Sequence, residues 1–245
     1  MWGLCWKARN ALSEITWCVD LGRMAYGPAL DLQHRLVAAR QAGRIPDVLL
    51  LLEHDAVITL GRRANPAHIL VPPDLLQQAG IEVRHVERGG DVTYHGPGQL
   101  VGYPILHLHE RHLGVGDYMH LLERMLIAAL ADFGLQAGTR PEYVGVWLGR
   151  NKVAALGARV EKGVSYHGFA LNVNTDLRAF SLIVPCGITD GGVTSMEREL
   201  GQPVAWGAVM ERVQKRFADH FGTRPVPVLP RELDKRLADV VSEAL

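Results

Sequence analysis

Hydrophobic positions recur along this chain with two different periods, and each period predicts its own type of element. Apolar residues spaced three and four apart predict helices over residues 26–42, 115–133, 204–221 and 231–244. Prolines at its start indicate a further short helix over residues 72–79. The strongest of these patterns is 115–133, where Tyr118, Leu122 and Met125 belong to one apolar stripe.

Short apolar or alternating runs between these helices predict strands over residues 15–21, 47–53, 56–60, 82–87, 99–108, 143–148, 152–160 and 164–173. The run 47–53 is almost wholly apolar, which is typical of a strand buried on both faces, and we expect 56–60 to be its neighbour in the sheet. Several strands follow one another without a helix between them, which favours antiparallel pairing. We therefore predict an α+β fold with a mixed, largely antiparallel sheet flanked by helices.

No internal repeat or low-complexity linker divides the sequence. We expect residues 1–14 to form an N-terminal leader and residues 15–245 to form a single catalytic domain, in which 223–245 is a C-terminal extension that carries a helix. A length of 245 residues is ample for one well-packed core.

Charge and cysteine content narrow the class of protein. Lys+Arg and Asp+Glu both number 26, so no basic excess points to nucleic acid or an anionic membrane as a partner. The longest apolar run, residues 48–52, is too short to span a bilayer. The three cysteines, Cys5, Cys18 and Cys186, are too widely spaced for a disulfide framework or a zinc site. We expect a cytoplasmic protein without a metal or cofactor.

The segment 88–100, with the sequence RGGDVTYHGPGQL, is the most conspicuous candidate site. Its four glycines and one proline let the backbone bend and approach a ligand closely, and Arg88, Asp91, Thr93 and His95 supply polar groups around the bend. The segment matches neither a P-loop nor a G-x-G-x-x-G fingerprint, so a nucleotide phosphate cradle is not indicated. A long hairpin without function is the alternative interpretation.

Lys152 stands at the start of the apolar strand 152–160. Its neighbours Val153 and Ala154 would remove water from the amine, and desolvation lowers the pKa of a lysine toward the range of a general base. The alternative is a lysine at a strand end with its amine in water.

Cys186 lies between a proline and a glycine at the end of another apolar run, a setting that predicts an exposed bend rather than continuous core strand. The spacing from Thr194 to Glu197 predicts a capping box and a short helix after it, whose N-terminus could favour the thiolate of Cys186. His95 and His167 sit in apolar or glycine-rich settings. Each is expected to be a hydrogen-bonded structural residue. The alternative is that one of them pairs with Cys186 as its base in a Cys–His nucleophile pair.

These segments occur together, and in this order, in one known family: the chain resembles the lipoyl(octanoyl) transferases of lipoate biosynthesis. The matching stretches are 88–104, 146–157, 167–172, 183–188 and 193–195, and the resemblance extends over roughly residues 15–221. The first stretch is long enough to make a chance match implausible.

The resemblance implies the fold of the biotin and lipoate protein ligase catalytic domain. It implies that octanoyl, or lipoyl, passes from acyl carrier protein through a thioester on Cys186 to a lysine amine, with Lys152 as the paired base. The acceptors implied are the lipoyl domains of 2-oxoacid dehydrogenase subunits and the H protein of glycine cleavage. The acyl-binding residues implied are Arg88, Gly89, Gly90, Asp91, Val92, Thr93, Tyr94, His95, Ala155, Leu156, Gly157, Gly168, Phe169 and Ala170, with His167 in the pocket wall.

Two other functions are open on the same residues. An ATP-dependent lipoate or biotin ligase would need no cysteine nucleophile and would bind adenylate. A carrier-binding module without chemistry would keep the pocket alone, although the presence of both Cys186 and Lys152 speaks against it. Small residues such as Ala155, Gly157 and Gly168 are expected to leave room for an alkyl tunnel.

Overall fold

The computed structural model describes residues 11–184 and 191–242 of the chain. Cys186 therefore lies outside the described residues. The helices are α1 (Ala11–Glu14), α2 (Tyr26–Gln41), α3 (Pro73–Gln78), α4 (Val115–Ala131), α5 (Met196–Leu200), α6 (Trp206–Phe221) and α7 (Pro230–Ser242), with 3-10 turns η1 (Pro66–His68) and η2 (Leu177–Leu182). Within the described part of the chain, no helix is both long and apolar enough to cross a membrane.

Among the described residues, twelve strands form two sheets. The strands are β1 (Ile15–Met24), β2 (Asp47–His54), β3 (Val57–Leu60), β4 (Glu82–His85), β5 (Val92–His95), β6 (Gln99–Ile105), β7 (Gly138–Arg140), β8 (Tyr143–Leu148), β9 (Asn151–Glu161), β10 (Val164–Asn172), β11 (Gly192–Val193) and β12 (Arg224–Pro227). The large sheet has the order β12-β1-β2-β6-β10-β9-β8-β7, with β11 beside β9, and the small sheet has the order β4-β3-β5.

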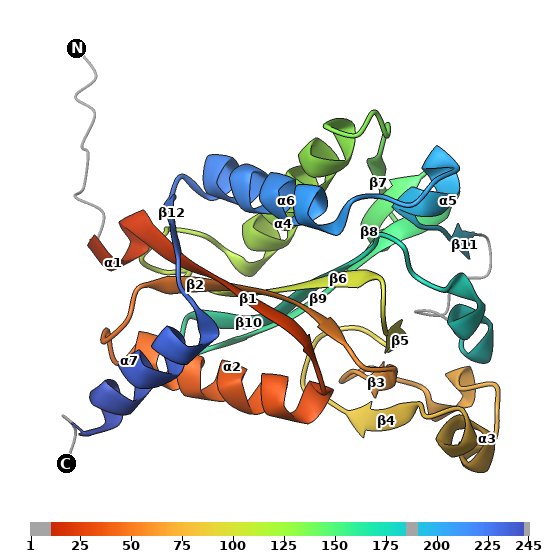
Figure 1. Ribbon diagram of the computed structural model, residues 1–245, viewed down its shortest axis with the longest axis horizontal. Helices are drawn as coiled ribbons and strands as arrows, with labels where there is room; N and C mark the ends of the chain where they lie inside the picture. Colours follow the sequence, from red (N-terminus) through yellow and green to blue (C-terminus); the bar gives the residue numbers. More distant parts are fainter. Residues whose placement is uncertain (1–10, 185–190, 243–245) are drawn as a thin grey trace.

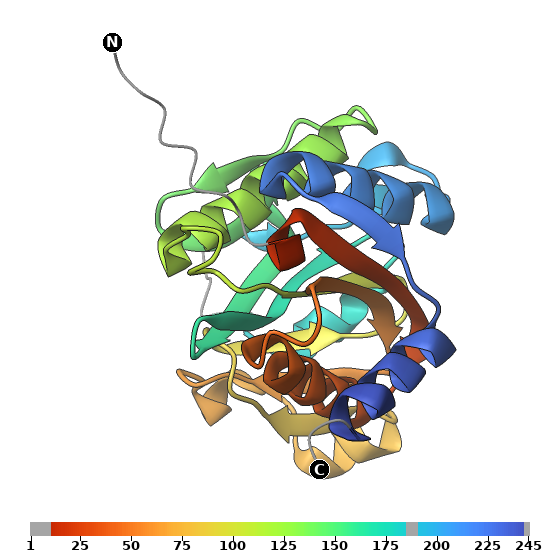
Figure 2. The ribbon, with the colours of Figure 1, turned by 90° about the vertical axis from the view of Figure 1, so that its left-hand side faces the viewer.

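The pairing in the large sheet is mostly antiparallel from β2 to β7, whereas β1 pairs in parallel with both β2 and β12. This confirms the predicted α+β class with a mixed sheet and flanking helices. Helices α4 and α6 cover one face of the sheet and α2 and α7 cover the other (Figures 1 and 2).

The sequence of β2 explains its place at the centre of these layers. Leu49 and Leu51 point into the core beneath α4 and α6, while Leu50 and Leu52 point into the core beneath α2. Alternate side chains of a strand face opposite sides of a sheet, so a strand covered on both sides has to be apolar throughout.

The prediction that residues 56–60 lie beside 47–53 was wrong. The edges of β2 are occupied by β1 and β6, and β3 belongs instead to the small sheet, where it pairs with β4 and β5. A run of apolar residues gives the strand but not its partner, because pairing is decided by contacts far apart in the sequence.

The glycine-rich segment is not a continuous loop. Val92–His95 forms β5 in the small sheet, and Gln99 begins β6 in the large sheet, so the residues between them carry the chain from one sheet to the other. The small sheet and α3 lie together at one end of the molecule (Figure 1). This arrangement sets the glycine-rich segment against the middle of the large sheet.

The short helix α5 also differs in detail from its prediction. Its N-cap is Ser195, whose hydroxyl accepts from the backbone N–H of Arg198 at 3.2 Å. Thr194, one residue earlier, donates its hydroxyl to Glu199 at 2.5 Å instead. The helix therefore begins one residue later than the spacing indicated.

Candidate active site

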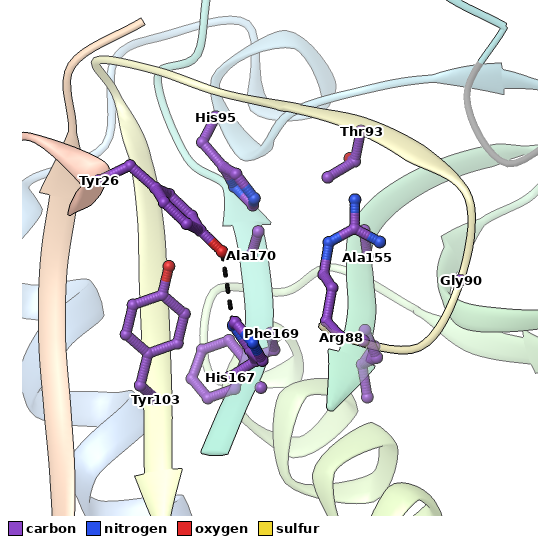
Figure 3. Close-up of a pocket in the computed structure, with 13 residues that line it drawn as sticks. Tyr26, Arg88, Gly90, Thr93, His95, Tyr103, Ala155, His167, Phe169 and Ala170 are labelled. Atoms are coloured by element: carbon purple, nitrogen blue, oxygen red, sulfur yellow. Dashed lines mark hydrogen bonds between the residues drawn. The ribbon is translucent and has the colours of Figure 1, made fainter. Parts of the chain in front are cut away.

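A pocket opens between the glycine-rich segment and the strands β9 and β10 (Figure 3). We call it the inner pocket. It is small, with a cavity volume of about 40 Å³. Its lining residues are Tyr26, Arg88, Gly90, Thr93, His95, Tyr103, Ala155, Leu156, Gly157, His167, Gly168, Phe169 and Ala170.

Most of the residues that the resemblance implied for acyl binding line this pocket, and four do not. Gly89 and Asp91 line an open cleft on the neighbouring surface. Val92 and Tyr94 pack instead into the small hydrophobic core that β3, β5 and η2 share. In strand β5 the side chains alternate, so Thr93 and His95 face the pocket while Val92 and Tyr94 face the core.

Asp91 has a structural contact of its own. Its carboxylate accepts from the backbone N–H of Asn65 at 3.0 Å and lies 2.5 Å from Nδ1 of His68. This side chain therefore fastens the segment before α3 to the glycine-rich segment.

Arg88 fixes the glycine-rich segment to the small sheet. Its guanidinium donates to the carbonyl oxygen of Thr59 at 2.7 Å, to the hydroxyl of the same residue at 2.9 Å, and to the carbonyl oxygen of Gly89 at 3.0 Å. The side chain is buried, and its charge reaches the histidines of the pocket.

Gly157 on β9 and Gly168 on β10 allow neighbouring backbone to approach these strands closely. A Cβ atom on Gly157 would lie 2.8 Å from the carbonyl oxygen of Gly89, and one on Gly168 would lie 2.3 Å from that of Gly102. Both glycines line the pocket, as expected. The space that a Cβ would occupy at either position is not open, as predicted, but is filled by neighbouring backbone. Any side chain here would push strands or loop apart.

Tyr26 and Tyr103 also line the pocket and were not among the predicted site residues. Tyr103 lies within the stretch 88–104 that carried the family resemblance, which is a signal that could have found it. Tyr26 begins α2, and no local pattern separates it from a core residue. The buried His54 contacts both of them, with ring centroids 4.9 Å from Tyr26 and 5.8 Å from Tyr103.

The two histidines of the pocket are neutral at physiological pH. Burial lowers the pKa of His95 to about 3, helped by the nearby His54 and Arg88. Burial also lowers the pKa of His167 to about 3, with Arg88 as the largest charge acting on it. Neither imidazole is suited to accept a proton near neutrality.

Lys152 is buried, with 6% of its surface exposed, rather than extended into water. Its ammonium lies 4.9 Å from the centroid of the Trp147 ring, and its backbone carbonyl accepts from Thr194 N–H at 2.9 Å. Burial removes hydration from the ammonium, and the ring face offsets part of that loss.

Lys152 stands where several hollows meet. It lines a connecting hollow together with Thr93, Ala155 and Ala170, which also line the inner pocket. It lines the open cleft, and it lines an outer hollow whose other members include Gly191, Gly192 and Val193. The lysine is therefore within reach of the inner pocket, of the surface, and of the first described residues after Cys186.

Cys18 is the one cysteine among residues 11–184 and 191–242, and it is buried. It lies in the core on β1, where burial raises its pKa to about 11. A thiol that stays protonated is a poor nucleophile. The same ranges contain no cluster of three or more histidine, cysteine, aspartate or glutamate side chains able to hold a metal ion.

Known proteins are similar to this chain in both sequence and fold. Residues 25–218 match the model of the lipoyl protein ligase A/B catalytic domain. An octanoyltransferase of Solibacter usitatus is 49% identical over 85% of this chain and 94% of its own length. One of Caldicellulosiruptor bescii is 48% identical over 82% of this chain and 90% of its own.

Solved structures agree on the fold. Lipoate-protein ligase A bound with ATP superposes with a TM-score of 0.77 at 16% identity, over 94% of this chain and 95% of that one. The biotin protein ligase of Aquifex aeolicus superposes with a TM-score of 0.50 at 13% identity, over 94% of this chain and 76% of that one. The fold predicted from the resemblance is confirmed, and this chain belongs to the lipoyl protein ligase A/B catalytic domain family, among its octanoyltransferases.

Proposed function

We propose that this protein transfers an octanoyl group from acyl carrier protein to a lysine amine of a lipoyl domain, and that the group is held in between as a thioester on Cys186. Membership among the octanoyltransferases supports the transfer. The observation that carries the mechanism is the position of Lys152, buried at the junction of the inner pocket, the open cleft and the outer hollow.

In the first half of the proposed reaction, Lys152 accepts the proton of the Cys186 thiol, and its ammonium stabilises the resulting thiolate. The thiolate attacks the carbonyl carbon of the octanoyl thioester, so that a new C–S bond forms while the C–S bond to the carrier breaks. The departing carrier thiolate takes the proton back from Lys152. Exchange of one thioester for another is nearly isoenergetic, so this step requires no ATP.

In the second half, the acceptor lysine attacks the thioester on Cys186 with its neutral amine. Lys152 takes the proton that the amine loses, and the Cys186 sulfur leaves as a thiolate that is then reprotonated. The open cleft beside Lys152 has a volume of about 740 Å³, which leaves room for a side chain from another protein.

The inner pocket is the proposed site of the alkyl chain. Phe169, Ala170 and Leu156 supply apolar surface, and Thr93 and Arg88 close the other side. Burial of the chain contributes roughly 0.8 kcal/mol per methylene, which is ample to hold a medium-chain acyl group.

Intact mass spectrometry tests the proposal. After incubation with octanoyl-acyl carrier protein, the protein should gain the mass of one octanoyl group, and Cys186→Ala should gain none. Cys18→Ala is the matched control, because Cys18 is also a cysteine but is buried and protonated, and it should keep the adduct. An adduct that persists in Cys186→Ala would overturn the thioester.

An ATP-dependent ligase is the competing function, since structural neighbours with this fold include lipoate and biotin ligases. The octanoyltransferase relatives disfavour it. Transfer of free octanoic acid that depends on ATP would revive it.

We further propose acceptors among the lipoyl domains of 2-oxoacid dehydrogenase subunits and the glycine cleavage H protein, and a cytoplasmic site of action, where a nucleophilic thiol stays reduced. Residues 15–245 are the proposed catalytic domain. In support, β1 near its beginning pairs with β12 near its end, for example Ile15 with Arg224.

A further inference from the structure

Trp147 is the largest fully buried side chain among the described residues, yet it belongs to none of the four hydrophobic clusters that those residues form. Its indole N–H is buried and has no hydrogen-bond partner among the described residues. A tryptophan that is buried inside a protein usually pairs its N–H. The position of this ring therefore needs an explanation other than core packing.

The neighbours of the ring are positively charged. The ammonium of Lys152 lies 4.9 Å from the centroid of the Trp147 ring, and the guanidinium carbon of Arg140 lies 4.8 Å from it. Arg140 also lies 5.2 Å from the centroid of the Tyr143 ring, which helps to fix its position. The face of an indole is electron-rich and attracts cations, most strongly where water is excluded. Since Trp147 and Lys152 are both buried, their contact is of this stronger kind.

Strand β8 also sets the path of the lysine side chain. Trp147 on β8 is the register partner of Lys152 on the neighbouring strand β9 (Figure 1). A Cβ on Gly145 would lie 3.0 Å from Cε of Lys152 and 3.3 Å from Cδ, so the alkyl stem passes over this glycine. The buried carboxylate of Glu123 in α4 accepts from the N–H of Gly145 at 3.1 Å and holds that backbone in place. The stem of Lys152 thus lies against Gly145, and its ammonium ends at the Trp147 ring.

We propose that Trp147 is a positioning residue of the transfer reaction, because its ring holds the Lys152 side chain where the hollows meet and favours its ammonium form. This inference rests on the proposed function, since it assumes that Lys152 exchanges protons with Cys186 and with the acceptor amine. Trp147 lines none of the hollows found among the described residues, so it acts on the reaction only through the lysine.

The ring should promote the step in which the lysine becomes charged. When the S–H bond of Cys186 breaks, the proton forms an N–H bond with the neutral amine of Lys152, and the electron pair stays on sulfur. Burial and the nearby charge of Arg140 both disfavour the ammonium that results. The ring face stabilises that ammonium and so increases the fraction of protein that carries the attacking thiolate.

Fluorinated tryptophans test this role with little change in the shape of the ring. Fluorine withdraws electron density from the ring face and weakens its attraction for a cation. The protein is prepared with tryptophan, 5-fluorotryptophan or 5,6,7-trifluorotryptophan, and adduct formation from octanoyl-acyl carrier protein is followed by rapid quench. We expect the maximal rate to fall stepwise, by about 10-fold with the trifluoro ring. The carrier concentration that gives half of this rate should change by less than about 2-fold, because the ring does not contact the substrate.

The chain offers a matched control among its other tryptophans. Trp17 is also buried and also has a cation over its ring, Arg236 at 4.7 Å, but it lies on β1 in the core beneath α2. The fluorination series is therefore repeated in Trp17→Phe and in Trp147→Phe. The stepwise loss of rate should remain in Trp17→Phe and disappear in Trp147→Phe. No loss in the wild-type chain, or a loss that persists in Trp147→Phe, would overturn the proposal.

A spectrum without substrate tests the contact itself. The ¹⁹F resonance of Trp147 in protein with 5-fluorotryptophan is the one that is absent from Trp147→Phe. Lys152→Met keeps an unbranched stem and removes the charge, so it should move this resonance and leave that of Trp17 in place. An unmoved resonance would contradict the contact. Octanoyl carrier with the unlabelled protein separates the two proposals: no adduct contradicts the proposed function, whereas an adduct on Cys186 whose rate is insensitive to fluorination contradicts only the role of Trp147.

Discussion

Nδ1 of His95 donates to Oε1 of Gln99 over 2.8 Å, because Nε2 of Gln99 faces the carbonyl oxygen of Tyr94 and Oδ1 of Asn172, and this bond joins the two sheets of the protein. His95 is the last residue of β5 in the small sheet, and Gln99 is the first residue of β6 in the large one. The turn between them is therefore held by a side-chain contact as well as by its glycines.

Replacement of Gln99 by leucine should destabilise the fold. It leaves Nδ1 of His95, Oδ1 of Asn172 and the carbonyl oxygen of Tyr94 without their buried partner, and each such group costs roughly 1–3 kcal/mol. We expect the free energy of unfolding in urea to fall by at least about 2 kcal/mol. Gln77→Leu, on the exposed side of α3, should change it by less than about 0.5 kcal/mol. Equal losses in the two variants would refute this account.

Replacement of Lys152 by alanine should slow octanoyl adduct formation by about 10²- to 10⁴-fold, the usual contribution of a proton-transfer group. Lys152→Arg should be impaired as well, because a guanidinium does not give up its proton. Rapid quench followed by intact mass measures the rate, and Lys215→Ala, on the exposed surface of α6, should be unaffected. Wild-type rates in Lys152→Ala would remove this residue from the mechanism.

A methyl group at Gly157 should displace the glycine-rich segment. The new Cβ would lie 2.8 Å from the carbonyl oxygen of Gly89, and backbone cannot move aside as a flexible side chain does. We expect Gly157→Ala to lose about 1–3 kcal/mol of stability and most of its transfer activity. Gly116→Ala, in α4 with open space around it, should instead gain about 0.5–1 kcal/mol. Thermal unfolding and the adduct assay report both effects.

The buried histidines should make the fold sensitive to mild acid. The pKa values of His95 and His167 fall from 6.5 to about 3 on folding, so between these values the unfolded chain binds more protons. Their contribution to stability is complete above pH 6.5 and is lost as the pH falls toward 3. As the pH falls from 6 to 5, each of these histidines should lower the free energy of unfolding by about 1 kcal/mol.

Urea unfolding at several pH values measures that slope. His95→Gln should reduce it by about one third to one half, because His54, whose pKa is also lowered by burial, and His167 are retained. His85→Gln, at an exposed position of β4, should leave the slope unchanged. A slope unaffected by His95→Gln would show that this imidazole is not held neutral by folding.

The candidate site was predictable where its residues form continuous motifs. The segment 88–95 and the strand residues 155–157 and 168–170 were recognised from the sequence, and most of them line one pocket. Tyr26 and His54 were missed, because each comes from a different element and shares no local pattern with the others. The sequence did not decide whether the Lys152 side chain is buried or exposed, because its packing against Trp147 depends on the tertiary structure.

The sequence by itself determined the type of the longer helices and strands, the α+β class, the family, and the nomination of Cys186 and Lys152, since periodicity and motifs are local properties of the chain. The short strands β5, β7, β11 and β12 were not predicted. Only the tertiary structure decided that β3 leaves the large sheet, that Lys152 is buried where the hollows meet, and that His95 and His167 are buried in the wall of one pocket. Strand pairing, desolvation and the direction of a hydrogen bond all depend on groups that folding brings together from distant parts of the sequence.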